Sequence, residues 1–441
     1  MSLHPAFLSI ARVSIFKLSS YDTPHRSLAI MEILTEEESR LVMESMVPPF
    51  IQHPLSEEDI ASLSAAGQDV LLIHGPGQEY KLTQNHRIPE IRSDNEILVK
   101  VMAVGLNPID WKGPDFNFGL PSLPWINGRD LAGFVVKAHR NLRRLRVGDV
   151  ILSPSTDYRD IRKAAFQEYV ISTEHNCARV PRDLPIQTSA VLGVAFVTAA
   201  LALGVCVGLD FSTSAELKGP NLYDLLREVP ANAYAPDIRE ECLNGITKTD
   251  RAKPGDWIAV WGASSATGLV ALQLAKLSGL RTVAIVDVAK HGEKLLAAGA
   301  ELLVDRVDTE RAIAIVRGVT NGRLRFALDT VGRETAEYLQ RTLGNERSHL
   351  VGLTGLPKTT SEGVAHHRVP IKSFHDIPKI GETLMVWLEK LLLTKRLIGP
   401  EVETAMGGLS GINKALHLLR EGTVTGKRLV VPLNQRTAVA A

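Results

Sequence analysis

A run of small residues joins an apolar segment to a helix-forming segment, and this arrangement can bind a phosphate group. The run is Gly262–Gly268, after the apolar segment Asp256–Trp261 and before Leu269–Lys276. An almost unbroken apolar segment is typical of a parallel strand buried on both faces. Small side chains let backbone N–H groups approach a ligand, and a helix N-terminus adds unpaired N–H groups and a partial positive charge. The pattern predicts a dinucleotide site, although Ala263 and Ser265 stand at two of the three glycine positions of the usual fingerprint. The predicted phosphate-binding residues are Ala263, Ser264, Ser265, Ala266, Thr267 and Gly268.

The next predicted strand ends where such a sheet meets the adenosine ribose. Strand Arg281–Val286 is followed by Asp287, whose carboxylate could accept hydrogen bonds from ribose hydroxyls and so favour NAD. Lys290, His291 and Arg306 lie on the same side and could bind a 2′-phosphate, which favours NADP. These residues are compatible with either NAD or NADP. The local sequence also fits a plain strand–helix corner of any α/β domain.

A third group of candidate residues follows the predicted strand His349–Gly352. Gly352, Leu353 and Thr354 fall at the carboxyl edge of the same sheet, where the nicotinamide ring binds in such folds. A plain turn is the alternative interpretation. Asp329 ends another strand and is interpreted as a turn or capping residue.

The elements that must position these residues are of two kinds. Short strands separated by Gly, Pro, Asp and Asn turns fill the chain from Asp69 to Ile171, which predicts a compact, mainly β, barrel-like unit. After Gly255 strands alternate with helices, which predicts a parallel, doubly wound sheet. The fold class is therefore α/β. The polar segment Leu209–Lys253, with helical fragments, is an insertion between the two patterns.

Composition excludes several function classes. The 441 residues are 45% hydrophobic and 22% charged with a net charge of +1, which gives no electrostatic case for nucleic acid or membrane binding. The three cysteines are widely separated, which fits a reducing compartment and no disulfide framework. The longest apolar run, Ser189–Leu209, fits a buried helix better than a membrane span. A cytoplasmic protein is expected; an acid-free N-terminus with basic residues leaves a mitochondrial presequence, or a start at Met31, as alternatives.

A series of short motifs brings a family resemblance into view. The motifs, in chain order, are Asn107–Asp110, Gly128–Gly133, Val147–Val150, Phe166–Val170, Val197–Ala199, Lys253–Asp256, Leu328–Gly332 and Gly426–Arg428. Their order and spacing resemble the medium-chain dehydrogenase/reductase superfamily, in its zinc-free quinone oxidoreductase and enoyl reductase branches. Within it the chain most resembles fungal oxidoreductases, including trans-acting enoyl reductases. The resemblance implies a GroES-like catalytic domain, a Rossmann domain, NADPH between them, and homodimerisation.

The metal ligands of the zinc-dependent relatives are missing from the sequence. Those relatives carry a Cys near Asn107, a His-Glu pair where Arg129 and Asp130 stand here, and a lobe of four cysteines. No Cys/His pattern with ligand spacing occurs, and the pair His366–His367 is interpreted as part of a polar surface loop. The sequence therefore predicts no zinc.

Reduction without a metal needs hydride delivery and a proton source for the developing enolate. Enoyl-thioester reductases of the superfamily place a Tyr shortly after the Asn-Pro turn, but Phe118 stands at the matching place here. Asn107, Lys112 and Tyr158 are candidate replacements, or water protonates the enolate. The family pattern also places Thr198 beside the nicotinamide, with a bond to its own helix as the alternative. The predicted catalytic residues are Asn107, Lys112 and Thr198.

The predicted function is a zinc-independent, NAD(P)H-dependent oxidoreductase that reduces an activated C=C bond of a quinone, an enone or an enoyl group. The alternative is a superfamily member that has lost catalysis and acts as a binding or trafficking protein. The expected divisions are an N-terminal extension over 1–66, a GroES-like catalytic domain over 67–190, a Rossmann domain over 191–375 that includes the insertion 209–253, and a C-terminal return over 376–441.

Overall fold

The computed structural model describes residues 49–57, 59, 67–214, 218–344 and 346–433. Most of the predicted N-terminal extension lies outside these residues. The chain divides into two units, Met1–Pro49 and Phe50–Ala441, and the second unit is the one described here.

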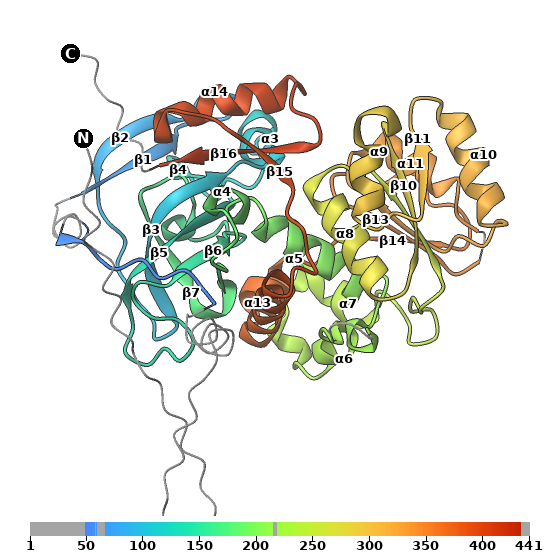
Figure 1. The fold of residues 1–441 in the computed structure, drawn as a ribbon, viewed down its shortest axis with the longest axis horizontal. Helices are drawn as coiled ribbons and strands as arrows, with labels where there is room; N and C mark the ends of the chain where they lie inside the picture. The colour runs from blue at the N-terminus through green and yellow to red at the C-terminus, as the bar shows by residue number, and fades with distance from the viewer. Residues whose placement is uncertain (1–48, 58, 60–66, 215–217, 345, 434–441) are drawn as a thin grey trace, which may run out of the picture. The chain divides into compact units, whose positions relative to one another are not determined.

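Six strands in the second half of the chain form a parallel sheet (Figure 1). They are β9 (Trp257–Trp261), β10 (Arg281–Val286), β11 (Leu302–Asp305), β12 (Phe326–Asp329), β13 (Ser348–Gly352) and β14 (Val364–His367). Their spatial order is β11-β10-β9-β12-β13-β14, and every neighbouring pair is parallel. The chain winds outward from β9 in one direction and from β12 in the other. Ligands of doubly wound sheets bind beyond the carboxyl ends of the strands at such a reversal.

Alternating side chains of β9 bury themselves against helices on the two faces of this sheet. Ile258 and Val260 pack into one apolar cluster with residues of α8 and α9, whereas Ala259 and Trp261 pack into another with residues of α10 and α11. These helices are α8 (Ala266–Leu277), α9 (Val288–Ala297), α10 (Thr309–Val319) and α11 (Arg333–Gln340). Burial on both faces explains why β9 is apolar throughout.

A largely antiparallel sheet and a smaller three-stranded sheet form the other part of the unit. The larger has the order β15-β16-β3-β5-β6-β8, with β7 paired to β3, and the smaller has the order β2-β1-β4. Their strands are β1 (Gln68–Ile73), β2 (Lys81–His86), β3 (Glu96–Gly105), β4 (Trp125–Ile126), β5 (Asp130–Ala138), β6 (Val150–Pro154), β7 (Tyr169–Thr173), β8 (Ala178–Arg179), β15 (Glu401–Thr404) and β16 (Lys427–Pro432). The other helices are α3 (Pro108–Phe116), α4 (Ile186–Ser189), α5 (Gly193–Leu201), α6 (Leu222–Arg227), α7 (Pro236–Asn244), α12 (Lys372–Asp376), α13 (Pro378–Leu393) and α14 (Gly408–Arg420). The predicted α/β fold class is confirmed.

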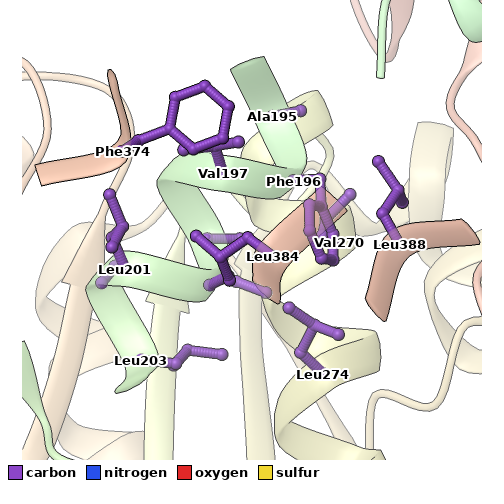
Figure 2. Packing of buried hydrophobic residues seen from close by; sticks show 14 of the residues in the cluster. Ala195, Phe196, Val197, Leu201, Leu203, Val270, Leu274, Phe374, Leu384 and Leu388 are labelled. Atoms are coloured by element: carbon purple, nitrogen blue, oxygen red, sulfur yellow. The ribbon is translucent and has the colours of Figure 1, made fainter. Parts of the chain in front are cut away.

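One apolar helical stretch lies at the centre of the largest core cluster. It spans Ile186–Cys206, has a mean hydropathy of 2.2, and is long enough to cross a membrane, but 89% of its apolar window is buried inside the protein. Figure 2 shows side chains of its helix α5 packed among side chains of α8 and α13. The stretch ends in a π-helical turn, η3 (Ala202–Cys206). Its burial is that of a core helix, in agreement with the interpretation of the sequence.

The insertion Leu209–Lys253 contributes to the core rather than only to the surface. It contains α6 and α7, close to the predicted helical fragments, and buries Phe211, Leu226 and Tyr234. The Phe211 ring lies 4.7 Å from the Trp387 ring of α13. These contacts place the described part of the insertion against η3 and α13.

A buried carboxylate ties α13 to the antiparallel sheet. Glu389 forms ion pairs of 2.7 Å with Arg144 and 2.8 Å with Arg179, and it also accepts a hydrogen bond from the Arg179 backbone N–H. Glu389 is only 3% exposed. Removing one partner of such a pair leaves buried charges without compensation.

We therefore expect Glu389→Ala to lower the free energy of unfolding by about 3 kcal/mol, measured by urea denaturation. Glu310→Ala, which breaks the exposed pair with Arg341, is the matched control and should leave stability unchanged. Equal effects of the two substitutions would contradict the structural role given to Glu389.

Candidate functional site

The small-residue turn between β9 and α8 is built around Gly262. Its φ of +79° is unfavourable for any residue with a side chain, and an added Cβ would lie 2.4 Å from Thr330 Oγ1. Gly268 is closely packed as well, since a Cβ there would lie 2.6 Å from the Gly262 carbonyl oxygen. Gly262, one residue before the position assigned to the first glycine of the fingerprint, makes the tight turn. Its place directly after the strand was the available signal.

Ser265, which stands at a glycine position of the fingerprint, caps the N-terminus of α8. It is the N-cap of α8, and its hydroxyl accepts a hydrogen bond of 3.0 Å from Gly268 N. The same hydroxyl donates to Thr330 Oγ1 at 3.0 Å. Because Gly268 N is already bonded, the N–H groups of Ala266 and Thr267 are the ones left at the helix start for an anion.

Ser264 and Thr267 are half-buried beside this turn. Neither hydroxyl has a hydrogen bond to another described residue, and Ala263 is fully buried. Together with Ser265 and Ala266, they form one continuous turn at the carboxyl end of β9.

The loop after β12 lies against this turn, and the loop after β13 lies against the loop after β12. Asp329 Oδ1 accepts hydrogen bonds from Val331 N (3.0 Å) and Gly332 N (2.8 Å), so its predicted turn role is confirmed. Burial raises the pKa of Asp329 to about 6. Leu353 N donates to the Asp329 carbonyl, and Thr354 Oγ1 donates to the Val331 carbonyl.

Gly352 closes this edge of the sheet. A Cβ on it would lie 2.6 Å from the Gly355 carbonyl oxygen, so the loop after β13 folds tightly back on the strand end. The predicted residues of the turn after β9 and of Gly352–Thr354 thus share the carboxyl edge at which the strand order reverses.

A charged cluster lies at the end of β10. Asp287 caps α9 by accepting a hydrogen bond from Lys290 N, and its carboxylate pairs with Lys290 Nζ at 3.0 Å. The hydrogen bond from Lys290 lowers the pKa of Asp287, and the charge of Arg306 acts in the same direction. Arg306 is exposed and His291 is half-buried. The structure therefore brings these four predicted residues together.

His291 also reaches the antiparallel sheet. Its ring lies so close to Gly426 that a Cβ there would be 2.4 Å from His291 Cε1. Burial lowers the pKa of His291, which favours the neutral ring. This contact joins the ribose end of the predicted cofactor site to the segment that enters β16.

The predicted catalytic residue Asn107 belongs to a buried polar network. Its Nδ2 donates to Asp130 Oδ2 at 3.0 Å and to the Gly105 carbonyl at 3.4 Å, and its Oδ1 accepts from Arg428 at 2.8 Å. Both hydrogens of the Asn107 side-chain amide are donated in these hydrogen bonds, so none is left for a substrate. Asn107 therefore positions Asp130 and Arg428 in this structure. Sequence reasoning singled out neither partner for this role, because their proximity depends on the pairing of β3 with β5 and β16.

Asp130 connects this network to the core helix. Its Oδ1 accepts a 2.8 Å hydrogen bond from Val194 N in the first turn of α5. Burial raises the pKa of Asp130 to about 6, although Arg428 and the hydrogen bonds from Asn107 and Val194 act in the opposite direction. The carboxylate thus fixes the helix that carries Thr198.

The side chains of the other candidate catalytic residues form fewer hydrogen bonds than that of Asn107. Lys112 is half-buried on α3, with Nζ 5.6 Å from the Trp111 ring. Thr198 is half-buried, and its hydroxyl bonds no other described residue, its own helix carbonyls included. Tyr158 is half-buried with Arg129 5.7 Å from its ring centroid, and Phe118 is 46% exposed.

The interpretation of His366–His367 as a surface loop is wrong. Both residues lie on β14, which pairs with β13, and His367 is 2% exposed. Although the sequence has no Cys/His pattern with ligand spacing, Cys206, Glu241 and His367 place their ligand atoms within 4.8 Å of one another. These residues are remote in sequence, so no spacing pattern could reveal them.

Comparisons with known proteins agree with this architecture. Residues 93–182 match the alcohol dehydrogenase GroES-like domain. Trans-enoyl reductase BOA5 of Botryotinia fuckeliana is 29% identical over 81% of this chain and 96% of its own. Trans-enoyl reductase poxP of Penicillium oxalicum is 28% identical over 80% of this chain and 90% of its own. These similarities support the resemblance to the medium-chain dehydrogenase/reductase superfamily. The relatives named here are trans-enoyl reductases, which are oxidoreductases.

Solved structures show the same fold at low sequence identity. Quinone oxidoreductase of Pseudomonas syringae has a TM-score of 0.62 and 19% identity, covering 83% of this chain and 99% of its own. Escherichia coli quinone oxidoreductase, solved in complex with NADPH, has a TM-score of 0.60 and 18% identity, with the same coverage of 83% and 99%.

Gly262→Ala should destabilise the protein more than Gly255→Ala does. Gly255 has a similar φ of +90° but nothing within 4 Å of an added Cβ, so both variants carry the conformational cost of about 1–2 kcal/mol. Only Gly262→Ala adds the clash with Thr330, worth about a further 1–3 kcal/mol. Denaturant unfolding of the two variants measures the difference, and equal stabilities would show that the turn after β9 is loosely packed.

Proposed function

We propose that this chain is an NADPH-dependent reductase of an activated C=C bond, with an enoyl group favoured over a quinone or a simple enone as the substrate class. The observation that carries the proposal is the Gly262–Gly268 turn at the strand-order reversal between β9 and β12. The trans-enoyl reductases among the relatives support the enoyl group.

The residues present fit a dinucleotide. Gly262 and Gly268 leave no room for a Cβ, which keeps the backbone of the turn close to the edge of the sheet. The N–H groups of Ala266 and Thr267 would bind the pyrophosphate at the N-terminus of α8. Thr198, with an uncommitted hydroxyl, and the Gly352–Thr354 loop would hold the nicotinamide end.

The charged cluster at the end of β10 supports NADPH over NADH. The Asp287 carboxylate is already paired with Lys290 and caps α9, so its charge is partly neutralised. Lys290 is 65% exposed at its side chain and Arg306 is also exposed, which leaves both cations accessible to a 2′-phosphate. Phosphate recognition by two cations is favourable because charge-assisted hydrogen bonds are the strong ones.

The bound cofactor would supply a hydride to the β-carbon of the enoyl group. The chain would then stabilise the enolate and deliver a proton to the α-carbon. Lys112 is the favoured donor, since Asn107 has no uncommitted N–H and Phe118 carries no acidic proton. The Asn107–Asp130–Arg428 network would act indirectly by holding α3 and α5 in position.

Lys290→Ala should raise the KM for NADPH about tenfold and leave the KM for NADH unchanged, because a charge-assisted contact contributes about 1.5 kcal/mol. Initial rates with each nicotinamide measure the effect. Lys379→Ala, which removes an exposed lysine paired with Glu228 on other elements, is the control. A loss of affinity for both nicotinamides would place Lys290 elsewhere than at the 2′-phosphate.

Lys112→Met should lower kcat for an enoyl thioester about 100-fold with little change in KM, because general acid catalysis contributes at least that much. Lys112→Arg keeps the positive charge and should be less impaired. An unaffected kcat would instead favour Tyr158 or water as the proton source.

The substrate panel decides between catalysis and the alternative of a binding protein. Wild-type protein should oxidise NADPH in the presence of enoyl thioesters, enones or quinones, with enoyl substrates the most rapid. Nicotinamide binding without turnover of any of these compounds would favour a binding role and overturn the proposed activity.

A further inference from the structure

Three potential metal ligands meet at a buried point formed by side chains other than those assigned to the cofactor. Cys206 lies in the π-helical turn after α5, Glu241 on α7 in the insertion, and His367 on β14 at the edge of the parallel sheet. Their ligand atoms lie within 4.8 Å of one another. A π-helical turn is a costly local distortion that often marks a functional position, and here it contains the cysteine.

The three side chains are buried to different extents, and one has a route to solvent. Cys206 is 0% exposed and His367 is 2% exposed, whereas the Glu241 side chain is 16% exposed. A cation would therefore enter past Glu241.

Hydrogen bonds already hold these groups in place. His367 Nδ1 lies 2.7 Å from Glu241 Oε1, and His367 Nε2 lies 2.9 Å from His349 Nδ1. The Cys206 thiol donates weakly to the Arg368 carbonyl at 3.9 Å. Metal-ligating histidines typically have their second ring nitrogen bonded in this way, which fixes the orientation of the ring.

His349 is itself buried, and its Nε2 has no hydrogen-bond partner among the described residues. Burial lowers the pKa of His349 to about 4, so this ring stays neutral beside His367.

We propose that Cys206, Glu241 and His367 bind one divalent transition-metal ion of the zinc type, with water at the fourth position. Thiolate, imidazole and carboxylate together are the ligand set of zinc and of metals that substitute for it. Charge balance supports the same assignment. A thiolate and a carboxylate neutralise a divalent cation, so the buried complex carries no net charge and avoids the cost of an isolated buried ion.

Metal binding would displace the proton of the Cys206 thiol. Burial raises the pKa of the Cys206 thiol well above its ordinary value, and the Glu241 carboxylate raises it further, so the thiol is protonated without metal. Ligation releases that proton to solvent, and the S–H bond is replaced by a metal–sulfur bond with no change of oxidation state. Affinity should therefore rise with pH.

The ligated metal would fasten the insertion to the sheet. Glu241 belongs to the insertion, Cys206 to the end of the core helix, and His367 to the edge strand. Cross-linking segments that are distant in sequence restricts the unfolded chain and stabilises the folded one. This assignment does not depend on the proposed reductase activity, because the cluster lies on different residues from those assigned to cofactor and substrate.

The test is metal titration of chelator-treated protein with Zn²⁺ and Co²⁺. We expect one equivalent of metal per chain, a thiolate-to-cobalt charge-transfer band, a higher midpoint of thermal unfolding, and affinity at pH 8 about tenfold or more above that at pH 6.

Cys206→Ser should abolish the charge-transfer band, and Glu241→Gln should weaken binding about tenfold or more. Glu241→Gln alters a partly exposed side chain, so it remains informative if the buried Cys206→Ser variant fails to fold. Cys242→Ser, one residue from Glu241 on the same helix, and Cys177→Ser, on a different element, are controls that should retain the band.

Wild-type protein that binds no stoichiometric metal, or a Cys206→Ser variant that folds and binds Co²⁺ as tightly as wild type, would overturn the proposal. The cluster would then be a hydrogen-bonded tie between the insertion and β14. Turnover of enoyl substrates is not part of this test, so failure of the metal site and failure of the reductase proposal are distinguishable.

Discussion

The buried carboxylate of Asp130 is the constraint on which the proposed active site depends. It accepts hydrogen bonds from Asn107 at the start of α3 and from Val194 at the start of α5, and it lies 3.7 Å from Arg428 of β16. The Asp130 carboxylate thereby connects α3, α5 and β16, which are distant in sequence. A charge at this depth is costly unless it is bonded on every side, and the position at a helix N-terminus adds a favourable dipole interaction. The same group therefore sets the positions of α3, which carries Lys112, and α5, which carries Thr198.

Sequence reasoning succeeded where one local signal was sufficient. The apolar run of β9, the small-residue turn and the following helix are contiguous, so periodicity and turn chemistry identified them together. The order of alternating strands and helices likewise predicted the doubly wound sheet. The fingerprint spacing did not single out Gly262, which has a positive φ and no space for a Cβ.

The features that were missed depend on contacts between distant segments. His366–His367 looked like loop residues because two histidines have no strand periodicity, yet pairing with β13 places them on β14 and buries His367. Asn107 looked like a free donor because its partners Asp130 and Arg428 come from other strands. The insertion is polar in sequence, but Phe211 and Tyr234 within it are buried in the core. No local pattern encodes such partners, since tertiary packing decides them.

The core helix shows why both ends of an apolar element need polar contacts. Apolar packing is non-directional, so a helix as hydrophobic as Ile186–Cys206 is held firmly in the core but only weakly fixed along its own axis. Directional bonds supply that missing constraint. At one end Asp130 binds Val194 N; at the other, Cys206 meets Glu241 and His367, and the π-helical turn brings the thiol to them. Thr198 lies between these two anchors, so the position of its hydroxyl along the helix axis is set by polar groups that never touch it.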